Sequence, residues 1–405
     1  MADRASVAVA FMLRAGSRYE SEPEAGISHF VEHMVFKGGG RYPTPRAVSE
    51  AIEGVGGVLN AATDREATVF WTRVPAVELR RAVSVLSDML LRPVLDPDEV
   101  ARERQVVIEE LRMYQDNPQD QVQIVFDEVM FPGHPLGRDV AGTEETVRSF
   151  TADACRSHLG RHVRPDALVV SIAGAVDPEA AKAMLLEELS PWVGERSSEP
   201  PPVPPPATPP DGEPLRLVRR TAEQANVLIG ARAPSYLDPD RYAVDILNVV
   251  LGEGMSSRLF LELRERQGVV YDVHSFTSRL ADTSVLGIGL GAEPRRMAGA
   301  AKAAVAELRR LAAEEVGDAE LTKAREYAKG RLLLQLESTS ALCEYAGQQQ
   351  LLTGTIVEPE EVVSRLDAVD AGEVRRVAGR VLDAGLRAAA VGPFRSQARL
   401  AAALA

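Results

Sequence analysis

The chain has little histidine, little cysteine and no long apolar run. Its 405 residues include six histidines and two cysteines. Two thiols exclude a disulfide framework, so Cys155 and Cys343 are expected to be free, at least partly buried and in a reducing compartment. No apolar run approaches the ~18 residues of a membrane helix, and residues 7–13 lack the length and cleavage site of a signal peptide. These absences predict a cytoplasmic protein with no membrane partner.

Positive charge is also scarce. The chain has 46 lysines and arginines against 59 acidic residues, which gives a formal net charge of −13. Nucleic acids and anionic membranes attract basic surfaces, so neither is expected as the main partner. An acidic surface instead favours basic peptides, although this preference is weak.

Two of the few histidines stand four residues apart, as His29-Phe-Val-Glu32-His33. Residues i and i+4 of a helix share a face, so His29 and His33 can converge on one cation. Glu32 lies beside His33, near enough to reach a water that the cation holds. The order His-x-x-Glu-His is the inverse of the commoner His-Glu-x-x-His zinc motif. The segment therefore predicts a catalytic zinc site.

His158 and His162 have the same spacing in a different setting. Gly160 lies between them, no acid occupies the corresponding place, and the surrounding stretch is basic. Helical spacing alone does not make a metal site. We interpret this second pair as structural.

An open zinc site needs a third protein ligand. A helix is predicted from Pro97 to about Gln115, with Asp96 as its N-cap. Glu103 and Glu110, seven residues apart, share one face of this helix. By itself such a carboxylate pair is more often solvated than functional.

The segment Gly-Ile-Ser-His-Phe-Val-Glu-His-Met-Val-Phe-Lys-Gly at residues 26–38 resembles the active-site helix of the M16 (pitrilysin-type) metallopeptidases, the family of mitochondrial processing peptidases and insulin-degrading enzyme. The resemblance implies that Glu110 is the third zinc ligand and that Glu103 supports the site from outside the ligand set. Glu109 does not match and would point about 100° away around the helix. The resemblance extends through residues 14–18, 56–63, 131–137 and 142–146 and covers nearly the whole chain.

The resemblance implies a zinc metalloendopeptidase of the inverzincin class, with one Zn²⁺ per chain held by His29, His33 and Glu110. Glu32 would act as the general base toward a zinc-activated water, and Glu103 would orient a ligand histidine. The substrates would be unfolded peptides or one precursor peptide. Two alternatives stay open: a non-catalytic or partner-dependent peptide-binding subunit, and a metal-dependent hydrolase acting on another substrate class.

The second half contains residues 251–271, which resemble the substrate-binding segment of the family. There the positions of Arg264 and Tyr271 reach toward the substrate near the zinc. Read alone, Arg264 is an exposed helical cation paired with Glu262 or Glu265. The resemblance favours the substrate-binding role, for which a guanidinium fork and a phenol hydroxyl are suited.

Residues 57–63 and 66–74 predict an antiparallel hairpin. In the family, the strand that matches residues 59–62 lies at a sheet edge, where an extended peptide can add as a further strand. Asn60 and Ala61 are therefore expected to contact substrate. The alternative interpretation is that these residues form an ordinary half-buried hairpin with no role in binding.

The chain is too long for one core, and residues 196–214 form a proline-rich linker expected to be stiff and extended. We predict a catalytic zinc-binding domain (1–195) and a structurally repeated, metal-free, substrate-binding domain (215–405). The helices expected near residues 295–311 and 319–336 echo those near 77–91 and 97–115. The fold class is α+β, with two homologous domains, each a mainly antiparallel sheet with helices packed on one face, as in the M16/LuxS-like fold.

The family generally needs four homologous domains, so the resemblance implies a homodimer in which Arg264 and Tyr271 of one chain face the zinc of the other. A heterodimer with a metal-free homologue is the alternative. Relatives usually begin with a strand before the one expected at residues 6–13. Either the start of this chain is late or its first sheet is trimmed.

Overall fold

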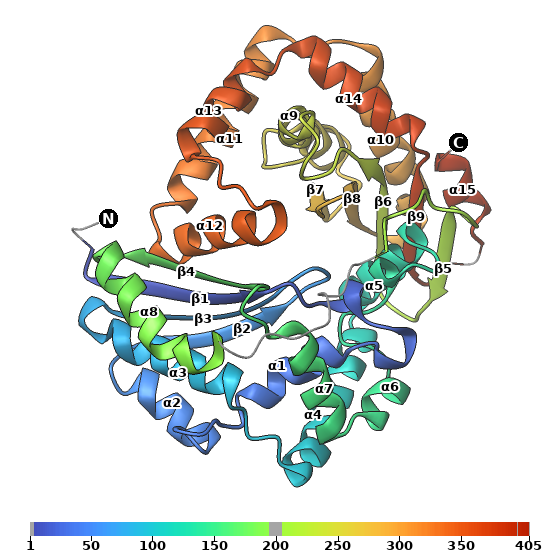
Figure 1. The fold of residues 1–405 in the computed structure, drawn as a ribbon. Coiled ribbons are helices and arrows are strands. Elements are labelled where there is room, and N and C mark those ends of the chain that lie inside the picture. Colours follow the sequence, from blue (N-terminus) through green and yellow to red (C-terminus); the bar gives the residue numbers. More distant parts are fainter. Residues whose placement is uncertain (1–3, 194–204, 395, 405) are drawn as a thin grey trace. The chain divides into compact units, whose positions relative to one another are not determined.

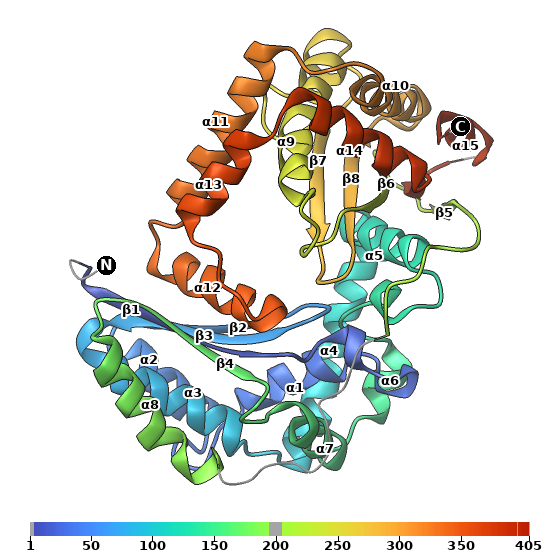
Figure 2. The same cartoon turned by 45° about the horizontal axis from the view of Figure 1, so that its top comes forward.

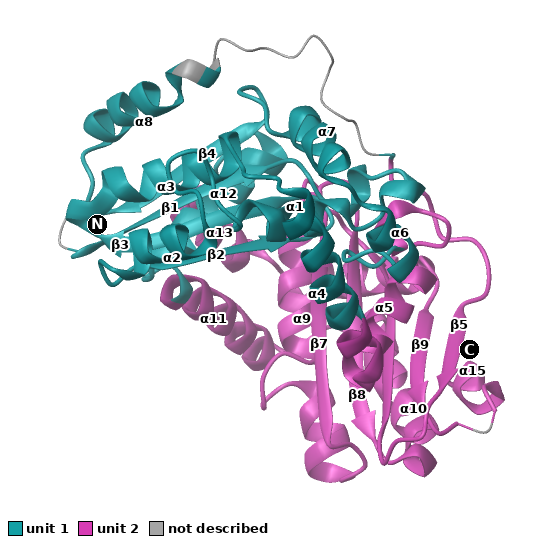
Figure 3. Ribbon diagram, turned by 90° about the horizontal axis from the view of Figure 1, so that it is seen from below, with its two compact units in different colours: residues 1–111, 138–205, 335–356 teal, residues 112–137, 206–334, 357–405 magenta. Residues whose placement is uncertain are grey.

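The computed structural model describes residues 4–193, 205–394 and 396–404, and the chain divides into two compact units (Figure 3). One unit comprises residues 1–111, 138–205 and 335–356, and the other comprises residues 112–137, 206–334 and 357–405. Of the places where the chain passes from one unit to the other, the one after residue 205 lies inside the expected linker. The contiguous halves expected from the sequence, 1–195 and 215–405, differ from these units because each half contributes a segment to the other unit.

The first unit is built on a four-stranded sheet with the order β2-β3-β1-β4. Its strands are β1 (Ser6–Leu13), β2 (Val58–Thr63), β3 (Thr68–Pro75) and β4 (Leu168–Gly174), and all neighbours are antiparallel. Its helices are α1 (Ile27–Val35), α2 (Pro45–Glu53), α3 (Leu79–Leu91), α4 (Pro97–Asp116), α6 (Glu144–Ser149), α7 (Ala152–His162), α8 (Pro178–Val193) and α12 (Thr339–Thr353), with short 3₁₀ turns η1 (Ser17–Tyr19), η2 (Glu22–Glu24) and η3 (Ala76–Glu78). The last residues of α4, from 112 on, belong to the second unit.

Strand β1 is buried on both faces. One set of alternate residues, including Val9 and Phe11, belongs to the cluster formed with α1, α2 and α3. The other set, Ala8, Ala10 and Met12, belongs to a second cluster with side chains of α12. Successive side chains of a strand point to opposite faces, so this division follows directly from the sequence of β1.

Helix α12 covers the face of this sheet opposite to α1, α2 and α3 (Figure 1). A Cβ at Gly347 would lie 2.6 Å from the Met12 side chain, so a glycine permits this close approach. The Ser171 hydroxyl donates to the Cys343 carbonyl at 2.7 Å. The α+β architecture is confirmed, but the expectation that helices cover one face was incomplete, because the small residues of the second face also need an apolar cover.

The second unit is built on a five-stranded sheet with the order β5-β9-β6-β8-β7. Its strands are β5 (Leu215–Arg219), β6 (Ala225–Ala233), β7 (Asp272–Arg279), β8 (Ser284–Ala292) and β9 (Arg387–Gly392), antiparallel except for the parallel pair β5–β9. Its helices are α5 (Pro118–Met130), α9 (Arg241–Leu251), α10 (Pro294–Ala313), α11 (Asp318–Gln335), α13 (Pro359–Ala368), α14 (Ala371–Asp383) and α15 (Ala398–Leu404), with the 3₁₀ turn η4 (Pro135–Gly137) and the π-helical segment η5 (Phe260–Arg266). Strands β7, β8, β6 and β9 repeat the arrangement of β2, β3, β1 and β4.

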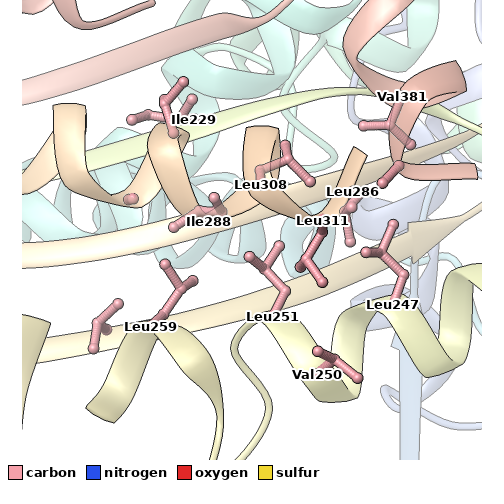
Figure 4. Close-up of a cluster of buried hydrophobic side chains, with 14 of the residues drawn as sticks. Ile229, Leu247, Val250, Leu251, Leu259, Leu286, Ile288, Leu308, Leu311 and Val381 are labelled. Atoms are coloured by element: carbon pink, nitrogen blue, oxygen red, sulfur yellow. The ribbon is translucent and has the colours of Figure 1, made fainter. Parts of the chain in front are cut away.

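The main core of the second unit lies between its sheet and helices α9, α10 and α14 (Figure 2). Ile229 and Ile288 from the sheet meet Leu247 and Leu251 of α9 and Leu308 of α10 there (Figure 4). Helix α5 covers the opposite face with Phe126 and its neighbours. Helices α5 and α12 therefore hold equivalent places: each lies, along the chain, in one half and completes the sheet formed by the other.

In the described part of the linker, from Pro205 on, several backbone carbonyl groups accept hydrogen bonds from arginine side chains. Arg18 donates to the Pro205 carbonyl at 2.8 Å within the first unit. Within the second unit, Arg232 donates to the Thr208 carbonyl and Arg387 to the Pro210 carbonyl. Residues 196–204 of the expected linker lie outside the described residues.

Both cysteines are free and buried, as expected. Burial raises the pKa of Cys155 to about 12 and that of Cys343 to about 11, so both thiols are held protonated at neutral pH. Within the described ranges, no helix is long and apolar enough to cross a membrane.

Candidate metal centre

Helix α1 separates an apolar side from a polar side. Phe30, Met34 and their neighbours on the apolar side are buried in the core of the first unit. His29 and His33 lie on the other side, partly exposed, with 14% and 23% of their side-chain surface accessible. The amphipathic pattern thus fixes which way the two imidazoles face.

Helix α4 begins as predicted. The Asp96 carboxylate accepts from the Asp98 and Glu99 N–H groups at 2.8 and 3.2 Å, which is the N-cap expected from the sequence. Glu103 is buried and Glu110 is half-buried, whereas the adjacent Glu109 is exposed. The face of α4 that carries Glu103 and Glu110 is therefore the one that turns toward the interior.

The two helices bring His29, His33 and Glu110 together. His29 Nε2 and His33 Nε2 are 3.3 Å apart, and Glu110 Oε2 lies 3.8 and 3.5 Å from them. Two ligand atoms that are each about 2.1 Å from a tetrahedral zinc ion lie roughly 3.4 Å apart. Among the residues that the structure describes, no other three His, Cys, Asp or Glu side chains bring their ligand atoms within 4.8 Å of one another. The triad thus fits a zinc ion in both donor chemistry and spacing.

His33 is oriented by a carboxylate that carries its own counter-ion. His33 Nδ1 is 2.9 Å from Glu103 Oε1, and Lys37 Nζ forms an ion pair with Glu103 Oε2. Burial alone would raise the pKa of Glu103, but its bonds with His33 and Lys37 hold that pKa below the ordinary value. An ionised acceptor on Nδ1 leaves Nε2 to face a metal ion.

His29 has a different environment. Burial, aided by the neighbouring His33, lowers the pKa of His29 to about 4, against the opposing charge of Glu110. The pKa of His33 is shifted the other way: burial lowers it, but Glu103 and the other nearby carboxylates raise it above the ordinary value. His29 therefore offers a neutral imidazole, the form that binds a metal.

Glu32 is held by a hydroxyl group from the edge strand. Thr63 Oγ1 on β2 donates to Glu32 Oε2 at 2.5 Å. Burial raises the pKa of Glu32, while the bond from Thr63 and the charge of His33 oppose the rise. A carboxylate with a raised pKa beside a metal site is suited to proton transfer.

Asn60 and Ala61 lie in β2, and β2 is an edge strand of its sheet. The predicted hairpin is present as β2 and β3, with Ala61 opposite Phe70. The Asn60 side chain accepts from the Ala61 N–H at 2.9 Å. An edge strand is where an extended peptide can add.

Arg264 and Tyr271 lie in the second unit and contact each other. Arg264 Nη1 donates to the Tyr271 carbonyl at 2.8 Å, and its guanidinium lies over the Phe260 ring. The alternative interpretation pairs Arg264 with Glu262 or Glu265, but Glu262 forms an ion pair with Arg266 instead. The Tyr271 side chain is 74% exposed. The segment that carries Arg264 is π-helical, a geometry often found at functional sites.

His158 and His162 are buried in α7, as the structural interpretation of this pair expects. Their ring centroids are 4.5 Å apart, and His162 Nδ1 lies 3.1 Å from the Arg14 carbonyl oxygen. Burial lowers the pKa of both side chains.

Two polar side chains that support the triad were not expected from the sequence. Lys37 follows α1 by one turn beyond His33, and Thr63 ends β2. Lys37 is within the segment that resembles the active-site helix, and Thr63 is within the matched residues 56–63. Their partners, Glu103 and Glu32, come from other elements, so no local pattern indicates the contacts.

Comparison with known proteins gives two family matches in tandem. Residues 2–144 match the model for insulinase (peptidase family M16), and residues 149–327 match the model for the peptidase M16 inactive domain. An uncharacterized zinc protease of Streptomyces coelicolor is 34% identical over 396 residues, covering 94% of this chain and 84% of that protein. The chain belongs to peptidase family M16. The uncharacterized zinc protease YmxG of Bacillus subtilis is 32% identical and covers 96% of this M16 chain and 93% of its own length.

Solved structures support the fold. A protease from Helicobacter pylori superimposes with a TM-score of 0.88 at 23% identity, covering 96% of this chain and 94% of that one. A structure described as a peptidase M16 inactive domain, from Pseudomonas fluorescens, gives a TM-score of 0.89 at 16% identity and covers 97% and 94% of the two chains. At these identities the likeness shows the M16 fold and nothing more.

Proposed function

We propose that this M16 chain is a zinc-dependent endopeptidase or oligopeptidase that hydrolyses unfolded peptides or a precursor peptide. The observation that supports this most strongly is the His29–His33–Glu110 triad with Glu32 on the same helix. A bound zinc ion would supply Lewis acidity, which lowers the pKa of a water molecule to near 7 and polarises a carbonyl group. The residues of the chain would supply proton transfer and orientation.

In this proposal, Glu32 is the general base. Thr63 holds Glu32 Oε2, and Oε1 takes the proton from the attacking water. Glu32 then returns this proton to the nitrogen of the leaving amine. The raised pKa of Glu32 makes the carboxyl group a better proton acceptor than an exposed glutamate.

Glu103 and Lys37 orient the ring of His33. The Glu103 carboxylate accepts a hydrogen bond from His33 Nδ1–H, so that His33 presents its Nε2 lone pair. Lys37 keeps Glu103 ionised and in place. Glu103 thus acts through His33 rather than on the substrate.

For substrate binding, we propose that an extended peptide pairs with β2 at Asn60 and Ala61, and that Arg264 and Tyr271 contact the same peptide. The edge position of β2 and the exposure of Tyr271 support these roles. We also propose a cytoplasmic homodimer, in which these two side chains act on the site of the partner chain. The alternative assembly is a heterodimer with a metal-free homologue.

The second candidate is a non-catalytic or partner-dependent peptide-binding subunit. The match of residues 149–327 to a domain described as inactive favours a binding role for the second half. The first half, with its metal triad and Glu32, favours catalysis. The two candidates differ in whether the purified chain alone cleaves peptides.

The deciding experiment is to incubate the purified chain with a mixture of unstructured peptides, with and without a chelator, and to identify products by mass spectrometry. Chelator-sensitive cleavage supports a peptidase, whereas one bound zinc without cleavage supports the binding subunit. Glu32→Gln is expected to retain zinc and lose cleavage by about 10²–10⁴-fold. Glu109→Gln, an exposed carboxylate next to a ligand, is the matched control. Full activity of Glu32→Gln would refute the role of Glu32.

A further inference from the structure

The N-terminus of α1 is capped by a side chain from outside the helix. Gly26, the residue before its first turn, has no side chain to act as a cap, and its φ of 93° lies in the left-handed region. The first N–H groups of a helix have no partner within it. Glu20 accepts from two of them: Oε2 from the Gly26 N–H and Oε1 from the Ser28 N–H, each at 2.8 Å.

Glu20 is itself almost fully buried, with 5% of its surface exposed. Burial raises its pKa, and the N–H groups of Ser28 and Gly26 and the charge of Arg138 oppose that rise. A buried carboxylate is unfavourable unless hydrogen bonds compensate for lost water. The positive end of the helix dipole also favours a carboxylate at this position.

The segment between Glu20 and α1 is held by contacts at both of its ends. Arg138 Nη1 donates to the Glu20 carbonyl at 2.9 Å. A Cβ at Gly26 would lie 2.4 Å from the Ala141 carbonyl oxygen, so the backbone here is packed directly against another loop. If the Glu20 carboxylate is removed, no backbone shift can supply a replacement acceptor easily.

The two metal-facing histidines differ in how they are oriented. Glu103 binds His33 Nδ1, whereas His29 Nδ1 is buried with no hydrogen-bond partner among the described residues. The direction of the His29 ring therefore depends on the backbone of the first turn of α1. His29 directly follows Ser28, whose N–H Glu20 binds.

We propose that Glu20 is a positioning residue of the metal site, which fixes the first turn of α1 so that His29 Nε2 stays near His33 Nε2 and Glu110 Oε2. The inference rests on the proposed metal-dependent function. Through the backbone, Glu20 does for His29 what Glu103 does for His33 through its ring.

The test compares Glu20→Ala and Glu20→Gln with Asp370→Ala. Asp370 is the N-cap of α14 and accepts from the Glu373 N–H at 2.7 Å, so its loss also uncaps a helix, but one without metal ligands. Zinc affinity is measured by competition with a chelator, the site geometry by the absorption spectrum of bound Co²⁺, and stability by thermal unfolding. Glu20→Ala is expected to weaken zinc binding by about 10-fold or more and to alter the Co²⁺ spectrum. Asp370→Ala is expected to lower the unfolding midpoint and leave both metal readouts unchanged.

Glu20→Gln keeps the side-chain volume but replaces one acceptor oxygen with an NH₂ donor, so it is also expected to weaken zinc binding. It decides the question if Glu20→Ala does not fold. Zinc affinity and Co²⁺ spectra equal to wild type in the folded Glu20 variants would overturn the inference. A wild-type chain that binds no zinc would overturn the proposed function itself.

Discussion

Four strands have the same arrangement in each of the two units, but the polar residues at equivalent places differ. Counted from the first residue of each helix, the seventh residue of α4 is Glu103 and the seventh of α11 is Ala324, and both are buried. The fourteenth is Glu110 in α4 and Arg331 in α11. Helix α9 contains no histidine. The scaffold is therefore shared, and among the described residues the candidate metal triad is found in one copy.

The comparison separates what specifies a fold from what specifies a site. The fourth residues of the same helices, Val100 and Leu321, are both buried and apolar. Apolar positions of this kind set helix packing and tolerate exchange among hydrophobic residues. A metal ligand tolerates no such exchange, since the donor atom itself is required. One repeat can thus lose the site without losing the fold.

The largest effect is expected from replacing Glu110 of α4 with arginine, the residue type that α11 has at the equivalent position, Arg331. Glu110→Arg replaces a ligand oxygen with a cation, so we expect loss of zinc binding and of any zinc-dependent cleavage by at least about 10³-fold. Zinc content after dialysis measures this directly. Glu109→Arg, which adds the same charge one residue away, is the control and is expected to retain the metal. Zinc retention by Glu110→Arg would show that Glu110 is not a ligand.

A smaller effect is expected from Glu103→Ala, which makes the buried position of α4 like Ala324. His33 then loses the acceptor on Nδ1 and Lys37 loses its partner, so zinc affinity should fall by about 10 to 100-fold. Chelator competition measures the change. Glu99→Ala, an acid in the first turn of the same helix, serves as the control. Unchanged affinity in Glu103→Ala would place Glu103 outside the site.

Acid sensitivity should also distinguish the units, because α7 contains a buried histidine pair and α14 has none. The pKa of His158 and of His162 is lowered in the folded state, so both are neutral there while the unfolded chain takes up protons below pH ~6.5. Their contribution to stability is present above that pH and is lost as the pH falls, by up to about 1.4 kcal/mol per pH unit for His158, whose pKa is lowered further than that of His162.

His158→Phe should therefore flatten the dependence of the unfolding free energy on pH between about pH 6.5 and 5 by that amount. Denaturation curves of the metal-free chain at several pH values provide the test. An identical slope in wild type and His158→Phe would mean that His158 is protonated in the folded chain.

The smallest effect is expected from the reverse exchange. Ala324→Glu with Arg331→Glu gives α11 the acids of α4, but α9 still offers no imidazole, so no second zinc should bind. Zinc stoichiometry by elemental analysis should stay at one per chain. Two zinc ions per chain would show that the acids alone create a site on this scaffold.

Several features were predictable because they depend on local spacing. The shared face of His29 and His33, the Asp96 cap of α4 and the β2–β3 hairpin all follow from residues close in sequence. The grouping of Glu110 with the histidines came from a family resemblance, and the structure places the three together. The substrate roles of Asn60, Ala61, Arg264 and Tyr271 stay predictions.

Other features depend on contacts between distant residues. Thr63 and Glu32 are bonded across 31 positions, and Lys37 meets Glu103 on a different helix. Nothing local in the sequence of α5 or α12 indicates which sheet the helix covers, because the strands of that sheet come from the other half of the chain. Composition identified the linker, yet gave no sign that arginines bind its carbonyl groups.

The place of α12 has a consequence for how the protein is made. The sheet that carries β1 and β2 needs residues 339–353 to cover its second face, where Ala10 and Met12 meet Cys343 and Leu351. During synthesis these late residues leave the ribosome long after β1, so the first sheet stays open on one side until most of the polypeptide has emerged. Such long-range contacts slow folding. A fragment ending at the linker would carry His29, His33 and Glu110 but leave that apolar face uncovered and prone to aggregation.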